Sequence, residues 1–172
     1  MIPFPDPPLR GDGFVLRRWT DADSEAYREA MRDPEAIRRL NDYGAESAAD
    51  IDAGRTAGRF LVLTIADAES DAFLGFVALN MQAFETAELA YMVAPGARGR
   101  GLAQAAVRLL GDWALAALRV GRLQLRIAPD NAASIRVAER CGYTFEGLLR
   151  SAFVLRGKRQ DCVLYSRLPT DP

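Results

Sequence analysis

Residues 88–103 decide the fold, and they read Glu-Leu-Ala-Tyr-Met-Val-Ala-Pro-Gly-Ala-Arg-Gly-Arg-Gly-Leu-Ala from Glu88 to Ala103. An apolar run ends before Pro95, a turn with glycines and arginines follows, and Leu102 begins a series of apolar residues at helical spacing. Free backbone N–H groups converge where such a turn enters a helix, and the helix dipole favours negative charge there. The stretch therefore predicts an anion site, with phosphate as the expected ligand.

The glycines and arginines of this turn fit that prediction. Gly99 and Gly101 permit a tight path and a close approach of the backbone, while Arg98 and Arg100 add positive charge. The spacing lacks the third small residue of a dinucleotide fingerprint, and no Gly-Lys-Ser/Thr follows as in nucleoside-triphosphate loops. The alternative is that the glycines only turn the chain, but the flanking strand and long helix favour the anion site.

The sequence on both sides of this stretch predicts a mixed α/β arrangement. The apolar runs 60–65 and 73–79 are separated by a short polar segment, which predicts an antiparallel hairpin. Further strands are expected at 13–19, 87–93 and 123–127, with a final hairpin of 145–155 and 162–168; helices are expected at 21–32, from Pro34 to Leu40, from after Glu46 to about Gly58, at 100–118 and at 131–140. This order predicts an α+β fold, with one mixed sheet and helices on both faces. We expect one domain over residues 1–172, in which 1–12 form an extended N-terminal segment.

Composition excludes several classes of function. The chain has no histidine, which excludes His-dependent zinc sites and Ser–His or Cys–His catalysis, and we expect no metal. The two cysteines, Cys141 and Cys162, are predicted to be buried and reduced. A formal net charge of −1 argues against a nucleic-acid partner, because such domains usually carry a basic excess. No apolar stretch approaches the roughly 20 residues that span a membrane, and the N-terminus does not read as a signal peptide, so we expect a cytoplasmic protein.

With these motifs in view, the sequence resembles the Gcn5-related N-acetyltransferase superfamily, whose cofactor motif is Arg/Gln-x-x-Gly-x-Gly/Ala. Residues 98–103 match it at every specified position, and a second block, Asn131 to Tyr143, fits the same family. The wording of that block is close to the branch of the Rim-type ribosomal-protein N-terminal acetyltransferases. The resemblance implies a mostly antiparallel sheet and acetyl-CoA as co-substrate. It implies cofactor contacts from Met92, Val93, Arg98, Gly99, Arg100, Gly101, Leu102, Ala103 and Asn131, with a main-chain N–H near Met92 or Val93 holding the oxyanion.

The chain departs from the family at the catalytic acid. Many members carry a tyrosine where this chain has Ala138, and in the Rim-like branch a serine one turn earlier, here Ser134, is the proposed substitute. The alternative for Ser134 is a hydroxyl that caps the helix or contacts the cofactor. Tyr91 is a second candidate for the acid, although a tyrosine in a strand beside Leu89 and Val93 is more often a core or pocket residue. Glu88 is the candidate base, with a structural ion pair to an arginine as its alternative.

The resemblance implies transfer of an acetyl group to a primary amine by direct attack in a ternary complex. The favoured acceptor is the α-amino group of a peptide or protein, with small amines such as polyamines, amino acids or antibiotics as the alternative. The missing tyrosine also leaves open an acyl-CoA-binding module without turnover, and the arginine-rich turn leaves open nucleic-acid binding, which would weaken steeply with salt. The sequence does not determine the acyl-chain preference, nor whether the chain is a monomer or a homodimer.

Overall fold

The structure is a computed structural model that describes residues 1–39 and 47–171. Its elements are the strands β1 (Leu9–Gly11), β2 (Phe14–Arg18), β3 (Phe60–Asp67), β4 (Phe73–Met81), β5 (Thr86–Val93), β6 (Arg122–Ile127), β7 (Thr144–Leu155) and β8 (Lys158–Arg167), the helices α1 (Asp21–Ala30), α2 (Pro34–Arg39), α3 (Ala48–Thr56), α4 (Leu102–Ala117) and α5 (Ala132–Arg140), and the 3-10 turn η1 (Pro95–Ala97). None of the described helices is long and apolar enough to cross a membrane.

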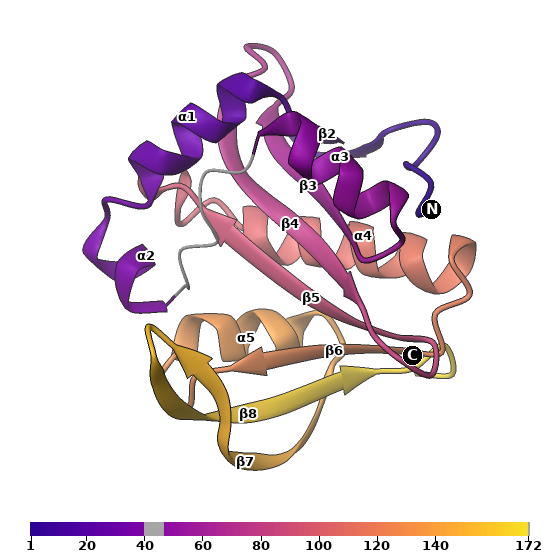
Figure 1. Cartoon of the computed structure of the whole chain (residues 1–172), viewed down its shortest axis with the longest axis vertical. Coiled ribbons are helices and arrows are strands. Elements are labelled where there is room, and N and C mark those ends of the chain that lie inside the picture. Colours follow the sequence, from indigo (N-terminus) through magenta and orange to yellow (C-terminus); the bar gives the residue numbers. More distant parts are fainter. Residues whose placement is uncertain (40–46, 172) are drawn as a thin grey trace.

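The strands form one sheet in the order β1-β2-β3-β4-β5-β6-β8-β7. Every neighbouring pair is antiparallel except β5 and β6, which run parallel (Figure 1). The sheet is therefore mixed and mostly antiparallel, as predicted. The parallel pair exists because α4 connects the two strands as a crossover, which returns the chain to the same end of the sheet.

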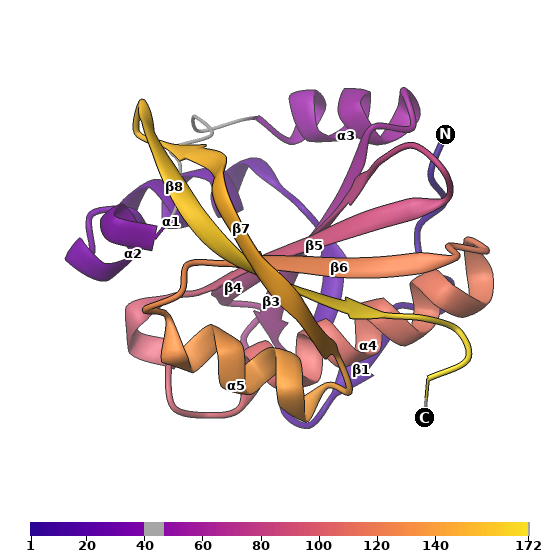
Figure 2. The ribbon, with the colours of Figure 1, turned by 90° about the horizontal axis from the view of Figure 1, so that it is seen from below.

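Helices cover both faces of the sheet, which confirms the predicted fold class. In Figure 2, α1, α2 and α3 lie on one side and α4 and α5 on the other. The larger core packs the α4 side chains Leu102, Ala106 and Leu110 against strands such as β3 and β6. A smaller cluster under α1 joins Tyr27 and Met92 with Phe76.

The predicted elements are present in the structure, with several ends shifted by one or two residues and larger differences at β1 and at the start of β8. Residues 1–12 were expected to form an extended N-terminal segment, and within it Leu9–Gly11 pair with β2 as the short strand β1, a pairing that the sequence did not predict. The last strand begins at Lys158 rather than at residue 162, because four polar residues continue the hairpin ladder beyond the apolar part. The first helix ends at Ala30 rather than at 32. The predicted ends at Leu40 and Glu46 lie outside the described residues.

A buried carboxylate fixes the start of α1 against the sheet. Asp23 is 2% exposed, forms an ion pair with Arg17 at 2.7 Å, and accepts hydrogen bonds from the Thr20 backbone N–H at 2.7 Å and the Thr64 hydroxyl at 3.0 Å. Burial by itself raises the pKa of the Asp23 carboxyl, but the hydrogen bonds from Arg17 and Thr20 together lower it below its ordinary value. Asp23 is therefore held as a carboxylate in the folded chain.

We expect Asp23→Asn to lower the free energy of unfolding by about 1–3 kcal/mol at pH 7, because it weakens charged hydrogen bonds in a buried network. Because the pKa of Asp23 is lower in the folded chain than in the unfolded chain, its carboxylate stabilises the fold at pH values above the unfolded pKa of about 3.9. This contribution is lost as the pH falls through the pKa of the folded chain. The difference between wild type and variant should therefore shrink below about pH 4. Urea unfolding across pH measures it, with exposed Asp12→Asn as the control. An equal loss in both variants would contradict the role of the buried network.

Candidate active site

The glycine turn, Arg98 to Gly101, follows β5 and η1 and leads into Leu102, the first residue of α4. Gly99 has a φ of +79° and Gly101, the N-cap of α4, a φ of +74°, so both occupy the left-handed region that favours glycine. A Cβ built at either position would meet no heavy atom within 4 Å, which means that both face open space. The turn thus presents the N-terminus of a 16-residue helix to solvent with no side chain at these two positions. This geometry suits the approach of a phosphate to backbone N–H groups.

A fork opens in the sheet beside that turn. The parallel ladder joins Thr86 to Arg122 and continues only as far as Glu88 and Gln124. Beyond this point β5 runs on to Val93 along β4, while β6 diverges with β8, and the two strands separate in Figure 1. Main-chain groups of β5 beyond Glu88 therefore have no ladder partner on the β6 side, and an extended ligand arm could pair with them.

The predicted base and one candidate acid lie on opposite faces of β5, because side chains alternate along a strand. Glu88 is on the face that also carries Met92, and Tyr91 is on the face packed against the larger core. The Glu88 carboxylate, 14% exposed, forms an ion pair with Arg126 of β6 at 2.8 Å and accepts a hydrogen bond from Gln82 at 2.9 Å. The structure thus contains the ion pair with an arginine that was the alternative to a catalytic role for Glu88. The role of Glu88 as a base stays a prediction.

The two candidate acids lie next to each other. The Tyr91 hydroxyl is buried and, within the described chain, has no hydrogen-bond partner at ordinary distance. Burial raises the pKa of Tyr91 to about 12, and the nearby Ser134 side chain acts in the opposite direction. A group with this pKa stays protonated at neutral pH, so it can donate a proton but cannot act as a base.

Asn131, rather than Ser134, caps α5. The Asn131 side chain accepts a hydrogen bond from the Ser134 backbone N–H at 3.1 Å, so the Ser134 hydroxyl is not needed for the cap. Ala138 is fully buried in the core, one turn further along the same helix. The position at which many family members carry tyrosine is therefore a packing position in this chain.

The two sequence blocks are brought together by contacts between α4 and α5. The Cys141 thiol donates to the Gln104 carbonyl at 3.3 Å, and Arg108 donates to the carbonyl of Arg140. Of the predicted cofactor residues, Leu102 and Met92 are buried, Ala103 lies in the first turn of α4, and Arg100 is exposed. Both cysteines are buried and free, as predicted.

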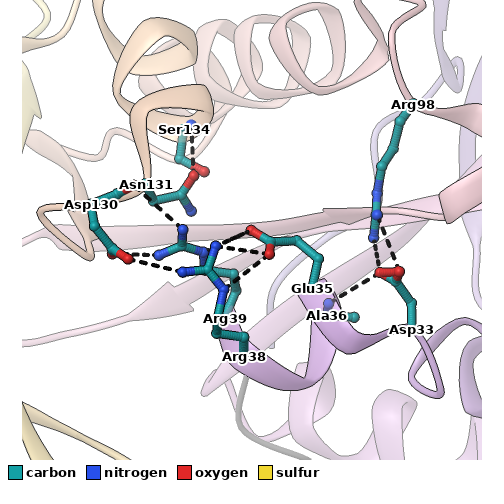
Figure 3. A network of polar contacts seen from close by, with 9 residues as sticks. All are labelled: Asp33, Glu35, Ala36, Arg38, Arg39, Arg98, Asp130, Asn131 and Ser134. Carbon is teal, nitrogen blue, oxygen red and sulfur yellow. Dashed lines mark hydrogen bonds and ion pairs between the residues drawn. The ribbon is translucent and has the colours of Figure 1, made fainter.

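Three polar contacts near the site had no signal in the sequence. Asp33, between α1 and α2, forms an ion pair with Arg98 at 2.8 Å. Arg38 and Arg39 of α2 both contact Asp130, directly before Asn131 (Figure 3). These pairs join positions 65 to 92 residues apart, which periodicity and motif spacing do not relate. Among the described residues there is no group of three or more Cys, Asp or Glu placed to hold a metal ion.

The sequence of this chain is similar to those of known acetyltransferases. The model of the acetyltransferase (GNAT) domain matches residues 14–144. The N-acetyltransferase p20 of Bacillus licheniformis is 26% identical over 168 residues, covering 93% of this chain and 88% of that protein. Streptothricin acetyltransferase of Streptomyces lavendulae is 29% identical over 165 residues, covering 94% of this chain and 79% of that protein.

Solved structures share the fold. The ribosomal-protein-S5-alanine acetyltransferase of Vibrio fischeri superposes with a TM-score of 0.82 at 16% identity, covering 95% of this chain and 97% of that one. RimL, a ribosomal L7/L12 alpha-N-protein acetyltransferase in complex with coenzyme A, superposes with a TM-score of 0.79 at 19% identity, covering 94% and 97%. The fold of this chain is therefore shared with a protein whose structure contains coenzyme A.

Proposed function

Because this chain belongs to the GNAT family of acetyltransferases, we propose that it moves the acetyl group of acetyl-CoA to the α-amino group of a peptide or protein N-terminus. The chain is an acyl-CoA-dependent N-acetyltransferase, as its family and its relatives are, and acetyl-CoA is its co-substrate. The acceptor is the part that we propose.

One observation carries the acetyl-CoA site on which the proposal rests: the fork between β5 and β6 opens beside the exposed glycine turn at the start of α4. The turn would hold the pyrophosphate, with Gly99 and Gly101 leaving room for it and Arg100 supplying positive charge, while Arg98 is paired with Asp33. The main chain at Met92 and Val93 would hold the pantetheine arm. Leu102, Ala103 and Asn131 would shape the two helix N-termini around it.

The side chains at the fork suggest how the protons move. The amine lone pair attacks the thioester carbon, and Glu88, directly or through a water, takes the proton that the amine loses. A main-chain N–H near Met92 or Val93 stabilises the oxyanion. As the carbon–sulfur bond breaks, the departing thiolate takes a proton from Ser134 or Tyr91. The base and the acids lie on opposite faces of β5, so the thioester in the fork would be reached from both sides.

An α-amine suits a site with this base. Its pKa of about 7.7 to 8 leaves a substantial neutral fraction at physiological pH, whereas a lysine amine near 10.4 needs more help to lose its proton. The resemblance of Asn131 to Tyr143 to the Rim-type branch also favours an α-amine, and RimL and the S5-alanine enzyme are named for ribosomal proteins. The match to streptothricin acetyltransferase, which extends over 94% of this chain, favours a small-molecule amine as the second candidate.

An acceptor panel tests the proposal. The purified protein is incubated with acetyl-CoA and unblocked peptides, the same peptides with acetylated N-termini, lysine peptides, spermidine, aminoglycosides and streptothricin, and thiol release is measured. We expect release with the unblocked peptides and loss of that release when the N-terminus is blocked. Release with small amines alone would overturn the peptide acceptor.

The variant Glu88→Gln distinguishes an enzyme from a module that only binds acyl-CoA. We expect kcat to fall roughly tenfold, since water can partly replace a base, while the affinity for CoA stays close to wild type. Cofactor binding without thiol release across the whole panel, in both wild type and Glu88→Gln, would instead favour an acyl-CoA-binding module.

A further inference from the structure

The Arg98 side chain makes three hydrogen bonds within the protein. Its Nε donates to the Val93 carbonyl at 3.4 Å, and its two terminal nitrogens donate to Asp33 at 3.3 Å and 2.8 Å. The two contacts with Asp33 form a bidentate ion pair, which fixes both the direction and the plane of the guanidinium. Arg98 therefore connects the end of β5 to the corner between α1 and α2.

Asp33 contacts both Arg98 and the first turn of α2. Its side chain accepts the Ala36 backbone N–H at 3.3 Å and is 17% exposed. The hydrogen bonds from Arg98 are the main reason that the pKa of Asp33 lies below its ordinary value, so the pair is charged at neutral pH. Figure 3 shows Asp33 beneath Arg98, with its carboxylate directed at the guanidinium.

Arg100 differs from Arg98, although both belong to the same turn. It is exposed, and within residues 1–39 and 47–171 it makes no hydrogen bond or ion pair. Its charge reaches Asp67, whose pKa is lowered mainly by hydrogen bonds from Ser70 and further by Arg100. Three of the five side-chain N–H groups of Arg98 are used within the protein, whereas those of Arg100 are all available to a phosphate.

Residues of α2 also contact the chain just before the second sequence block, Asn131 to Tyr143. Arg38 and Arg39 contact Asp130 at 2.9 Å and 2.5 Å, and both also contact Glu35 of their own helix. Asp130 precedes the cap residue Asn131. Residues 33–39 thus touch both the glycine turn and the N-terminus of α5, the two places where the cofactor is expected.

We propose that Asp33 is a positioning residue for acetyl transfer: it holds Arg98, whose Nε donates to the Val93 carbonyl, and thereby fixes the end of β5 beside the fork, while Arg100 meets the cofactor phosphates. The inference rests on the proposed function, because positioning matters only if an acceptor reacts there. A displacement of about 1 Å at a reacting centre can cost on the order of 100-fold in rate. Loss of the Asp33–Arg98 pair should therefore affect the reaction more than it affects cofactor binding.

The test compares Asp33→Asn, Arg98→Gln and Arg100→Gln. Asparagine is as good a helix cap as aspartate, so Asp33→Asn removes the charge and keeps the cap. We expect Asp33→Asn and Arg98→Gln each to lower kcat at saturating acetyl-CoA roughly tenfold, with less than about a threefold change in the Kd for CoA. Their double variant should be no worse than either alone, because both remove one pair. Arg100→Gln should raise the Kd for CoA about tenfold and leave kcat at saturating acetyl-CoA near wild type.

Glu29→Gln is the matched control, since it removes the same charge from an exposed pair with Arg32 near the same corner. Its kinetics should equal those of wild type. The inference is overturned if Asp33→Asn behaves like Glu29→Gln, or if Arg98→Gln weakens CoA binding as much as Arg100→Gln. Calorimetric titration with CoA needs no acceptor, so it tests the different roles of the two arginines even if no amine releases thiol. A failure of the proposed function would therefore be distinguishable from a failure of this inference.

Discussion

Gly101→Val is expected to weaken CoA binding at least roughly 100-fold, about 2.8 kcal/mol at 1.4 kcal/mol for each factor of ten. Gly101 caps α4 at a φ of +74° and faces open space. A valine there would point its methyl groups into the region from which a phosphate must approach the backbone N–H groups. It would also strain the turn by roughly 1–3 kcal/mol, because β-branched residues avoid the left-handed region. Calorimetry with CoA measures the loss directly.

Gly58→Val separates occlusion of the site from strain. Gly58 has nearly the same φ, +73°, and only ordinary space around its Cβ position. It lies at the far end of the sheet: the adjacent strand β3 begins at Phe60, which pairs with Asn80, whereas the glycine turn follows Val93, which pairs with Gly75. Both variants should lose similar stability in urea unfolding, but only Gly101→Val should lose CoA affinity. Equal affinities for CoA in the two variants would remove the glycine turn from the cofactor site.

The second large effect is expected at the pair of candidate acids. Tyr91→Phe and Ser134→Ala should each lower kcat roughly 100-fold, the low end for general acid catalysis, because a thiolate is already a fair leaving group. The affinity for CoA should change little. Since Tyr91 and Ser134 are neighbours, they would deliver one proton along one path, and the double variant should be no slower than the slower single variant. Steady-state thiol release with a reactive acceptor measures all three.

Tyr143→Phe is the control for this pair. The Tyr143 hydroxyl is likewise buried without a hydrogen-bond partner in the described chain, and burial raises its pKa as well, but it lies beside Gly111 and Arg167 rather than at the fork. Its removal should leave kcat unchanged. A normal rate in Ser134→Ala together with a loss in Tyr91→Phe would make Tyr91 the acid alone. Normal rates in both would exclude both as proton donors.

The sequence by itself determined the elements whose cause is local. The two apolar runs 60–65 and 73–79, joined by a short polar segment, predicted the hairpin β3–β4, and the helical spacing of apolar residues after Leu102 predicted α4. The two glycines were read correctly as positions that need special backbone angles. The strand β1 was missed because a three-residue strand after a proline-rich segment has no period to detect. The start of β8 was missed because Lys158 to Asp161 are all polar and exposed.

Only the tertiary structure decided how the site is assembled. The fork exists because the β5–β6 ladder ends at Glu88, and the end of a ladder depends on how two strands twist apart rather than on either sequence. The approach of Tyr91 to Ser134, the ion pair of Glu88 with Arg126 and the hold of Asp33 on Arg98 join residues 38 to 65 positions apart, with 43 between Tyr91 and Ser134. Motif spacing identifies residues that act through their own backbone, such as the glycine turn. Contacts between distant side chains arise only when packing brings their elements together, which is why the sequence could nominate Glu88, Tyr91 and Ser134 but not the partners that orient them.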